Sequence, residues 1–200
     1  ESTASALDAE NALVISGALA ALDKMPSGTL EVLNVLAFLD SDNDVLRRTA
    51  ALIASKHLKW DAALANRFFE WDSYSPHRIE TLTMVVPSLL SAPPMRDLVT
   101  SLVTDEDTAK NDLALQLLAE AQDVGMDPAW VEPLSPFLLP EADPIRRSLL
   151  LKFLSHNPAP QFHADLQRLW NEEELPLANR LQALVALSAE KKELSETDFR

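Results

Sequence analysis

The chain has 200 residues and a formal net charge of −14, with 47% hydrophobic and 24% charged residues. This balance is typical of a folded protein, and the acidity opposes non-specific binding to nucleic acid and to anionic membranes, both of which require basic surface. The chain has no cysteine, which excludes disulfides, thiol catalysis and thiolate metal ligands.

The composition favours helices. Only three glycines are present, which leaves little material for tight β-hairpin turns, and leucine and alanine dominate over the β-branched residues that favour strands. We therefore predict an all-α fold. In chain order, the predicted helices are 10–23, 29–39, 44–58, 61–70, 76–91, 95–103, 106–123, 128–138, 144–155, 161–171 and 176–189.

Prolines mark three of the predicted helix starts. A residue that can cap a helix stands directly before a proline at Ser75–Pro76, Asp127–Pro128 and Asp143–Pro144. Within its predicted helix, Pro87 should kink or shorten the segment. The apolar run at 12–22 is shorter than the ~20 residues of a membrane span, so we expect no membrane insertion.

One sequence pattern occurs twice, as DNDVLRRTA from Asp42 and as ADPIRRSLL from Ala142. Both place an Asp three residues before an arginine pair and an apolar run after it. Related helix starts are then found at Asp8, Asp44, Ser75, Asp107, Asp143 and Leu175. A repeat of thirty-odd residues that contains two helices predicts an irregular α-solenoid of about five to six antiparallel helical hairpins. We expect these hairpins to form one domain over residues 1–200.

The segments Leu46–Ala50 and Ile145–Leu149 resemble the V-R-x-x-A core of HEAT repeats, which lies in the second helix of each hairpin. Six residues before the Arg, where that family commonly has an Asp, this chain has Ser41 and Pro140. The resemblance implies a non-catalytic scaffold that binds a protein partner or a neighbouring domain of its own longer chain. Because the sequence begins with Glu1 rather than Met, we expect it to be a piece of a multidomain protein.

Two kinds of HEAT-like enzyme are the alternatives to a scaffold. A DNA glycosylase of this kind would need a basic groove, which the acidity of the chain opposes. A bilin lyase or isomerase would need a pigment pocket. We expect no nucleic-acid partner and no enzymatic activity in this chain.

The two arginine pairs are interpreted as structural. Adjacent helical residues point about 100° apart, so one arginine of each pair can face the seam between repeats. We expect Arg47 and Arg146 to take this role together with Asp44 and Asp143. The second arginine of each pair, Arg48 or Arg147, is expected to point elsewhere and to be solvated.

Aromatic residues are concentrated between positions 60 and 77. Trp71 and Tyr74 stand in this segment, and both residue types commonly anchor protein interfaces. They are a candidate partner-binding patch, and the alternative is that they pack between repeats as part of the core.

The acidic loop at 40–45 spaces Asp40, Asp42 and Asp44 as in a calcium loop. An EF-hand needs Gly at the sixth position and Glu at the twelfth, where this chain has Val45 and Ala51. Helix capping is the preferred interpretation of these acids.

No other sequence motif favours a particular chemistry. The four histidines form no HExxH pattern, and the serines have no nucleophile-elbow context. Capping or packing is the preferred role of His57 and His156, which lie near predicted helix ends. We therefore expect no catalytic, cofactor-binding or metal site.

Overall fold

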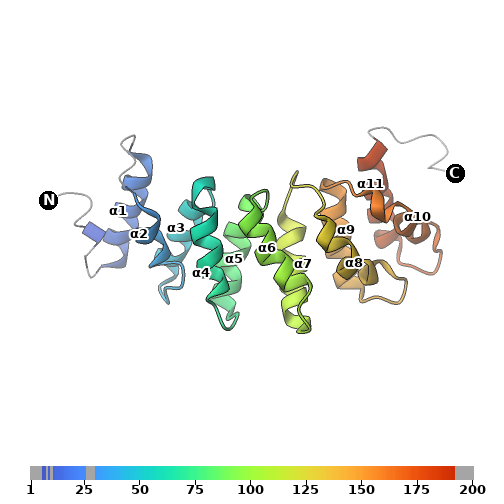
Figure 1. The fold of residues 1–200 in the computed structure, drawn as a ribbon, viewed down its shortest axis with the longest axis horizontal. Coiled ribbons are helices and arrows are strands. Elements are labelled where there is room, and N and C mark those ends of the chain that lie inside the picture. Colours follow the sequence, from blue (N-terminus) through green and yellow to red (C-terminus); the bar gives the residue numbers. More distant parts are fainter. Residues whose placement is uncertain (1–5, 8, 10, 26–29, 192–200) are drawn as a thin grey trace. The chain divides into compact units, whose positions relative to one another are not determined.

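The computed structural model describes residues 6–7, 9, 11–25 and 30–191. Every regular element in these residues is a helix, which confirms the prediction of an all-α fold (Figure 1). Over the same residues, no helix is both long enough and apolar enough to cross a membrane.

The chain divides into two compact units, Glu1–Leu98 and Val99–Arg200, with the boundary inside α6 (Pro93–Val103). Each unit has its own set of buried apolar side chains. The single domain expected from the sequence stays a prediction.

The first unit is built around α3, which packs against α1, α2 and α5, while α2 also packs against α4. A short 3-10 turn leads into α4. The helices of this unit before α6 are α1 (Ala12–Lys24), α2 (Val32–Leu36), α3 (Asp44–Ala54), η2 (Leu58–Trp60), α4 (Asp61–Phe69) and α5 (Pro76–Leu89).

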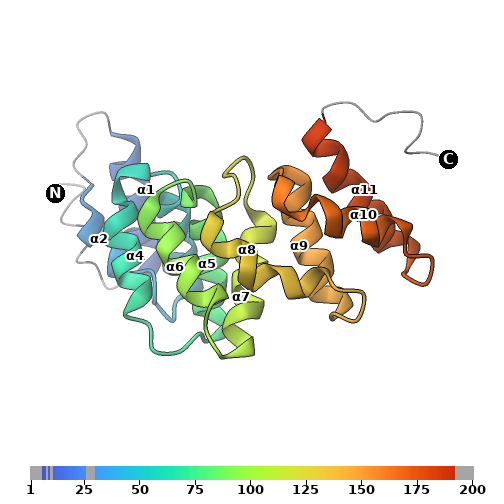
Figure 2. The same cartoon turned by 45° about the vertical axis from the view of Figure 1, so that its right-hand side comes forward.

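In the second unit α9 is the central helix and packs against α7 and α11, and α10 packs against α11 (Figure 2). Here too, short 3-10 turns connect the longer helices. After α6, the elements are α7 (Thr108–Glu120), α8 (Pro128–Leu134), η3 (Ser135–Leu138), α9 (Pro144–His156), η4 (Pro160–Phe162), α10 (His163–Asn171) and α11 (Leu177–Lys191).

Helix starts recur at a regular spacing. The N-cap residues of α1, α3, α5 and α7 are Asn11, Asn43, Ser75 and Asp107, each 32 residues after the one before. The next odd-numbered helix, α9, is capped by Asp143. Four of these five side chains accept a hydrogen bond from the first turn of their helix, and that of Ser75 does not.

Prolines explain two differences from the predicted boundaries. The segment predicted as one helix at 128–138 changes from α-helix to a 3-10 turn near Pro136, which has no N–H to continue the α-helical ladder. Pro87 lies inside α5, which ends two residues later at Leu89. The predicted start at Asp8 lies outside the described residues, and α1 begins at Ala12.

The core of the second unit contains a tryptophan with a satisfied polar atom. Trp130 is fully buried and meets Phe153 edge to face, with ring centroids 6.2 Å apart. Its indole N–H donates to Thr100 Oγ1 at 2.7 Å. Because the indole N–H is hydrogen-bonded, Trp130 adds a large apolar surface to the core without leaving a buried donor unpaired.

Asn157, the C-cap residue of α9, holds the loop after α7 in place. It is fully buried, and its Oδ1 accepts from the backbone N–H groups of Val124 at 2.8 Å and Gly125 at 3.2 Å. Its Nδ2 donates to the carbonyl oxygens of Ala121 and Phe153, both at 3.0 Å. Gly125 has φ of +70°, a conformation that glycine adopts without strain.

We predict that Asn157→Ala lowers the free energy of unfolding by about 2–4 kcal/mol, because it removes four hydrogen bonds, two of them to carbonyl groups of buried residues. Asn171→Ala, at the exposed C-terminal residue of α10, should change it by less than about 0.5 kcal/mol. Urea denaturation followed by circular dichroism measures both values. Equal effects would contradict the structural role of Asn157.

Candidate functional site

Arg47 is the fourth residue of α3, and its guanidinium is buried. Nη1 donates to the carbonyl oxygen of Ser41 at 2.9 Å, and Nη2 donates to Glu80 Oε2 at 3.0 Å and to Asp44. Burial acts to lower the pKa of Arg47, but the hydrogen bonds to Glu80 and Asp44 raise it overall. Arg47 therefore links α3 to its preceding loop and to α5.

Arg147 is the fourth residue of α9 and is only 1% exposed. Its Nη2 lies 2.7–2.8 Å from three backbone carbonyl oxygens of the preceding loop, those of Leu139, Pro140 and Ala142. Burial lowers the pKa of the Arg147 guanidinium, but arginine stays protonated in proteins. The expectation that Arg147 is solvated is therefore wrong.

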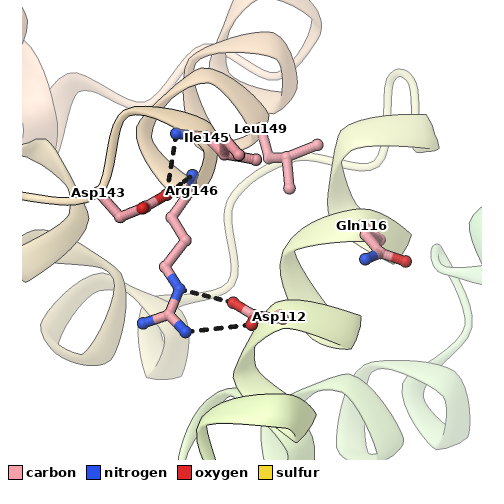
Figure 3. Close-up of a pocket in the computed structure, with 6 residues that line it drawn as sticks. All are labelled: Asp112, Gln116, Asp143, Ile145, Arg146 and Leu149. Atoms are coloured by element: carbon pink, nitrogen blue, oxygen red, sulfur yellow. Dashed lines mark hydrogen bonds and ion pairs between the residues drawn. The ribbon is translucent and has the colours of Figure 1, made fainter.

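Arg146 has a different role from Arg147. Its guanidinium forms a two-point ion pair with Asp112 on α7, with Nε 2.6 Å from Oδ1 and Nη2 3.1 Å from Oδ2 (Figure 3). The Arg146 side chain is 29% exposed, and the backbone N–H of Arg146 donates to the cap residue Asp143. Arg146 thus links α9 to α7 near the surface.

Counting from the N-caps explains the difference between the two arginine pairs. The N-cap of α3 is Asn43 and that of α9 is Asp143, so the position of Arg47 corresponds to that of Arg147. Aligning the pairs by sequence instead matches Arg47 with Arg146, which is one residue out of register. The burial of Arg47 and Arg147 follows the helix position.

The same fourth position carries a carbonyl-binding donor in two further helices. In α7 it is Asn111, and in α11 it is Arg180, whose Nε donates to the carbonyl oxygen of Trp170 at 3.0 Å. The Nδ2 group of Asn111 lies 3.0–3.2 Å from the carbonyl oxygens of Leu102, Val103 and Asp105. Neither residue was predicted from the sequence, and the signal available was a polar residue at the fourth position of each helix.

Asp40 is bound by two side chains from the first turn of α5. Arg78 donates from Nε at 2.8 Å and from Nη2 at 2.6 Å, and His77 Nε2 lies 3.1 Å away. The Arg78 hydrogen bonds are the main reason that the pKa of Asp40 lies below its usual value. Among the residues that the structure describes, no group of three or more His, Cys, Asp or Glu side chains is placed to hold a metal ion.

Trp71 belongs to the core of the first unit. It is 4% exposed and tilts against Phe68, with ring centroids 5.0 Å apart. The Arg78 guanidinium lies 5.3 Å from the Trp71 ring centroid. Tyr74 is half-buried. The structure therefore does not present Trp71 as an exposed anchor, and core packing, the alternative considered from the sequence, describes it.

His57 connects α1 to the residues after α3. Its ring stacks on Trp60 with centroids 3.9 Å apart, and its Nε2 lies 2.6 Å from Asp23 Oδ1. Packing and a hydrogen bond to Asp23, rather than helix capping, describe this side chain.

An exposed apolar stripe is present on four odd-numbered helices, α1 and α3 in the first unit and α9 and α11 in the second. Its members stand at the second, fifth or ninth position of their helix, and these positions lie on one helix face because their spacings are three and four residues. They are Leu13, Val45, Leu52, Ile145, Leu181 and Val185. The residues at the same positions of α5 are half-buried.

Two hollows lie on this face of the second unit. The acidic hollow, between α7 and α9, has a volume of about 490 Å³ and contains both Asp112 and Asp143 (Figure 3). The apolar hollow, between α9 and α11, has a volume of about 230 Å³. Its lining consists of Leu151, Lys152, Ser155, Leu181, Gln182 and Val185.

Comparisons with known proteins bear on the fold. No protein-family model matches the chain, and no curated protein matches it significantly. Among solved structures, the chain is similar to an engineered protein determined by crystallography, with a TM-score of 0.50 and 18% sequence identity over 95% of each chain. At this identity the likeness concerns the fold alone.

We predict that Arg147→Ala lowers the free energy of unfolding by about 2–4 kcal/mol, because three carbonyl groups lose a buried donor. Arg146→Ala should cost only about 0–1 kcal/mol, as for other partly exposed ion pairs. Chemical denaturation of the two single variants gives the comparison. A larger loss for Arg146→Ala would show that the helix position does not decide the effect.

The Asp40 ion pair should make the first unit sensitive to acid. Because the folded pKa of Asp40 is lowered, its contribution is present above the unfolded pKa of about 3.9 and is lost as pH falls through the folded value. Asp40→Asn should therefore be less stable than the parent at pH 7, and the difference should shrink below about pH 4. Denaturant titrations at both pH values, with the exposed Asp42→Asn as control, measure this. A pH-independent difference would contradict the assignment.

Proposed function

We propose that this chain is a HEAT-like α-solenoid that acts as a non-catalytic scaffold. It binds a protein, or a neighbouring domain of a longer chain, through the exposed stripe of its odd-numbered helices. The observation that carries the proposal is the recurrence of exposed apolar side chains at equivalent positions, such as Val45 and Ile145 at the second residue of α3 and α9.

The helix arrangement supports the repeat part of the proposal. Four successive N-caps are 32 residues apart, and within each unit the odd-numbered helices pack on one another in order. A fourth-position donor to backbone carbonyls recurs in α3, α7, α9 and α11. Such recurrences are expected of repeats that share one packing scheme.

The exposed stripe supports the binding part. Exposed apolar side chains contribute little to folding when they stand alone, but a row of them on adjacent helices is a feature of protein-binding surfaces. Within each unit, polar pairs such as Ser16–Thr49 and Ser148–Gln182 join neighbouring odd-numbered helices, with oxygen–oxygen and nitrogen–oxygen distances of 2.8 and 3.0 Å. These hydrogen bonds fix the neighbouring helices that carry the stripe relative to one another within each unit.

Site-specific photo-crosslinking tests the proposal. A photo-reactive amino acid at the position of Leu52 or Leu181, in the protein produced in its own cells, should give covalent adducts with another protein or with another domain of the same chain. The matched controls are the exposed positions of Asn66 on α4 and Gln167 on α10. Adducts at the control positions and none at the stripe would place binding on the other helices and contradict the proposal.

A further inference from the structure

Three exposed apolar residues lie on α11: Leu177 at its first position, and the stripe residues Leu181 and Val185. Leu177, Leu181 and Val185 follow one another at four-residue spacing, which places them on one face of the helix. All three are exposed, at 63%, 46% and 53%. This face borders α9, because Leu181 and Val185 line one hollow together with residues of α9.

The apolar hollow gives this face a place for an anchoring side chain. Leu151, which is fully buried, lines it together with the exposed Leu181 and Val185. Lys152 also lines it, and its Nζ pairs with Glu120 Oε1 at 2.8 Å. The hollow therefore combines an apolar wall with a lysine whose charge is already matched within the chain.

The acidic hollow lies between α9 and α7, with Asp112 facing Arg146 (Figure 3). Ile145, 73% exposed, and Leu149 supply its apolar wall, and Asp112 and Asp143 supply carboxylates. Arg146 is the cation of this hollow, and it is paired with Asp112. Two carboxylates against one arginine leave the lining with an excess negative charge.

Charge decides between the candidate occupants of this surface. A second copy of the chain would also carry a net charge of −14, and two such copies repel each other. A cationic partner gains both from the long-range field and from the acidic hollow. An extended row of apolar residues beside a hollow suits an amphipathic helix that inserts side chains at helical spacing.

We propose that the α9–α11 face binds a cationic amphipathic helix of a partner protein. An apolar side chain of that helix occupies the apolar hollow against Leu151, Leu181 and Val185, and its lysines or arginines lie toward Asp112 and Asp143. This inference rests on the proposed scaffold function and assigns it a surface and a partner chemistry.

Three synthetic helical peptides of equal length test the proposal. The first has leucines on one face and lysines on the other, the second replaces the lysines with glutamates, and the third replaces the leucines with alanines. Binding of each to the whole chain is measured by fluorescence anisotropy at two salt concentrations. Leu181→Ser is the test variant, and Leu52→Ser, on the same stripe of the first unit, is its matched control.

We expect the leucine–lysine peptide to bind at least tenfold more tightly than the other two, and more weakly at the higher salt concentration. Leu181→Ser should weaken this binding at least tenfold, whereas Leu52→Ser should leave it unchanged. Unchanged circular dichroism of both variants shows that the fold is retained.

The other outcomes overturn the inference in distinguishable ways. Equal binding of the alanine–lysine peptide, insensitive to Leu181→Ser, would show charge attraction without a site. Tight binding of the leucine–glutamate peptide would contradict the cationic partner, and concentration-dependent dimers lost in Leu181→Ser would assign the face to a second copy.

Weakening of peptide binding by Leu52→Ser alone would move the site to the first unit and leave the scaffold function standing. No binding by any peptide overturns this inference, and the scaffold function falls as well if crosslinking at the stripe also fails.

Discussion

The hydrogen bonds from the fourth residue of α3, α7, α9 and α11 to the carbonyl groups before it are the interaction on which the placement of these helices depends. The last carbonyl groups of a helix have no partner within that helix, and the carbonyl groups of the connecting loops need donors as well when they are buried. Arg47, Asn111, Arg147 and Arg180 each supply a donor to a carbonyl that precedes their helix. One side chain thereby fixes both the turn and the rotation of the next helix about its own axis.

The rotation fixed in this way also determines which residues face outward. The second residue of a helix points about 200° away from the fourth, and the fifth and ninth lie on the same side as the second. With Arg147 directed into the protein, Ile145 is necessarily exposed. On α3, α9 and α11 the exposed stripe is therefore a geometric consequence of the inward-facing donors, and its apolar composition, which folding does not require, is the basis of the binding role proposed above.

Much of the fold could be predicted from the sequence, because capping residues and prolines mark the helix starts. Asp127 and Asp143 precede prolines and cap their helices as expected. The roles of Arg146 and Arg147 could not be predicted, because aligning the two Arg-Arg pairs matches Arg47 with Arg146. Aligning the N-caps of α3 and α9 instead matches Arg47 with Arg147, and the burial of the side chains follows this second alignment. Asn111 was missed because it performs with an amide what Arg147 performs with a guanidinium. Likewise, the burial of Trp71 against Phe68 and Arg78 could not be predicted, because the side chain follows the end of α4 and helical periodicity does not set its direction there.

The most direct test of the central claim is the stability of Asn111→Asp relative to the parent protein as a function of pH. The substitution keeps the size of the side chain and replaces its amide donor with a carboxylate that faces three carbonyl oxygens. The account predicts a loss of about 2–4 kcal/mol at pH 7. The loss should shrink as the pH falls toward 4, because burial beside carbonyls raises the pKa of a carboxyl group, and the protonated form can donate again. If Asn111→Asp were as stable as the parent protein at pH 7, the donor at the fourth position would not be what holds these helices in place.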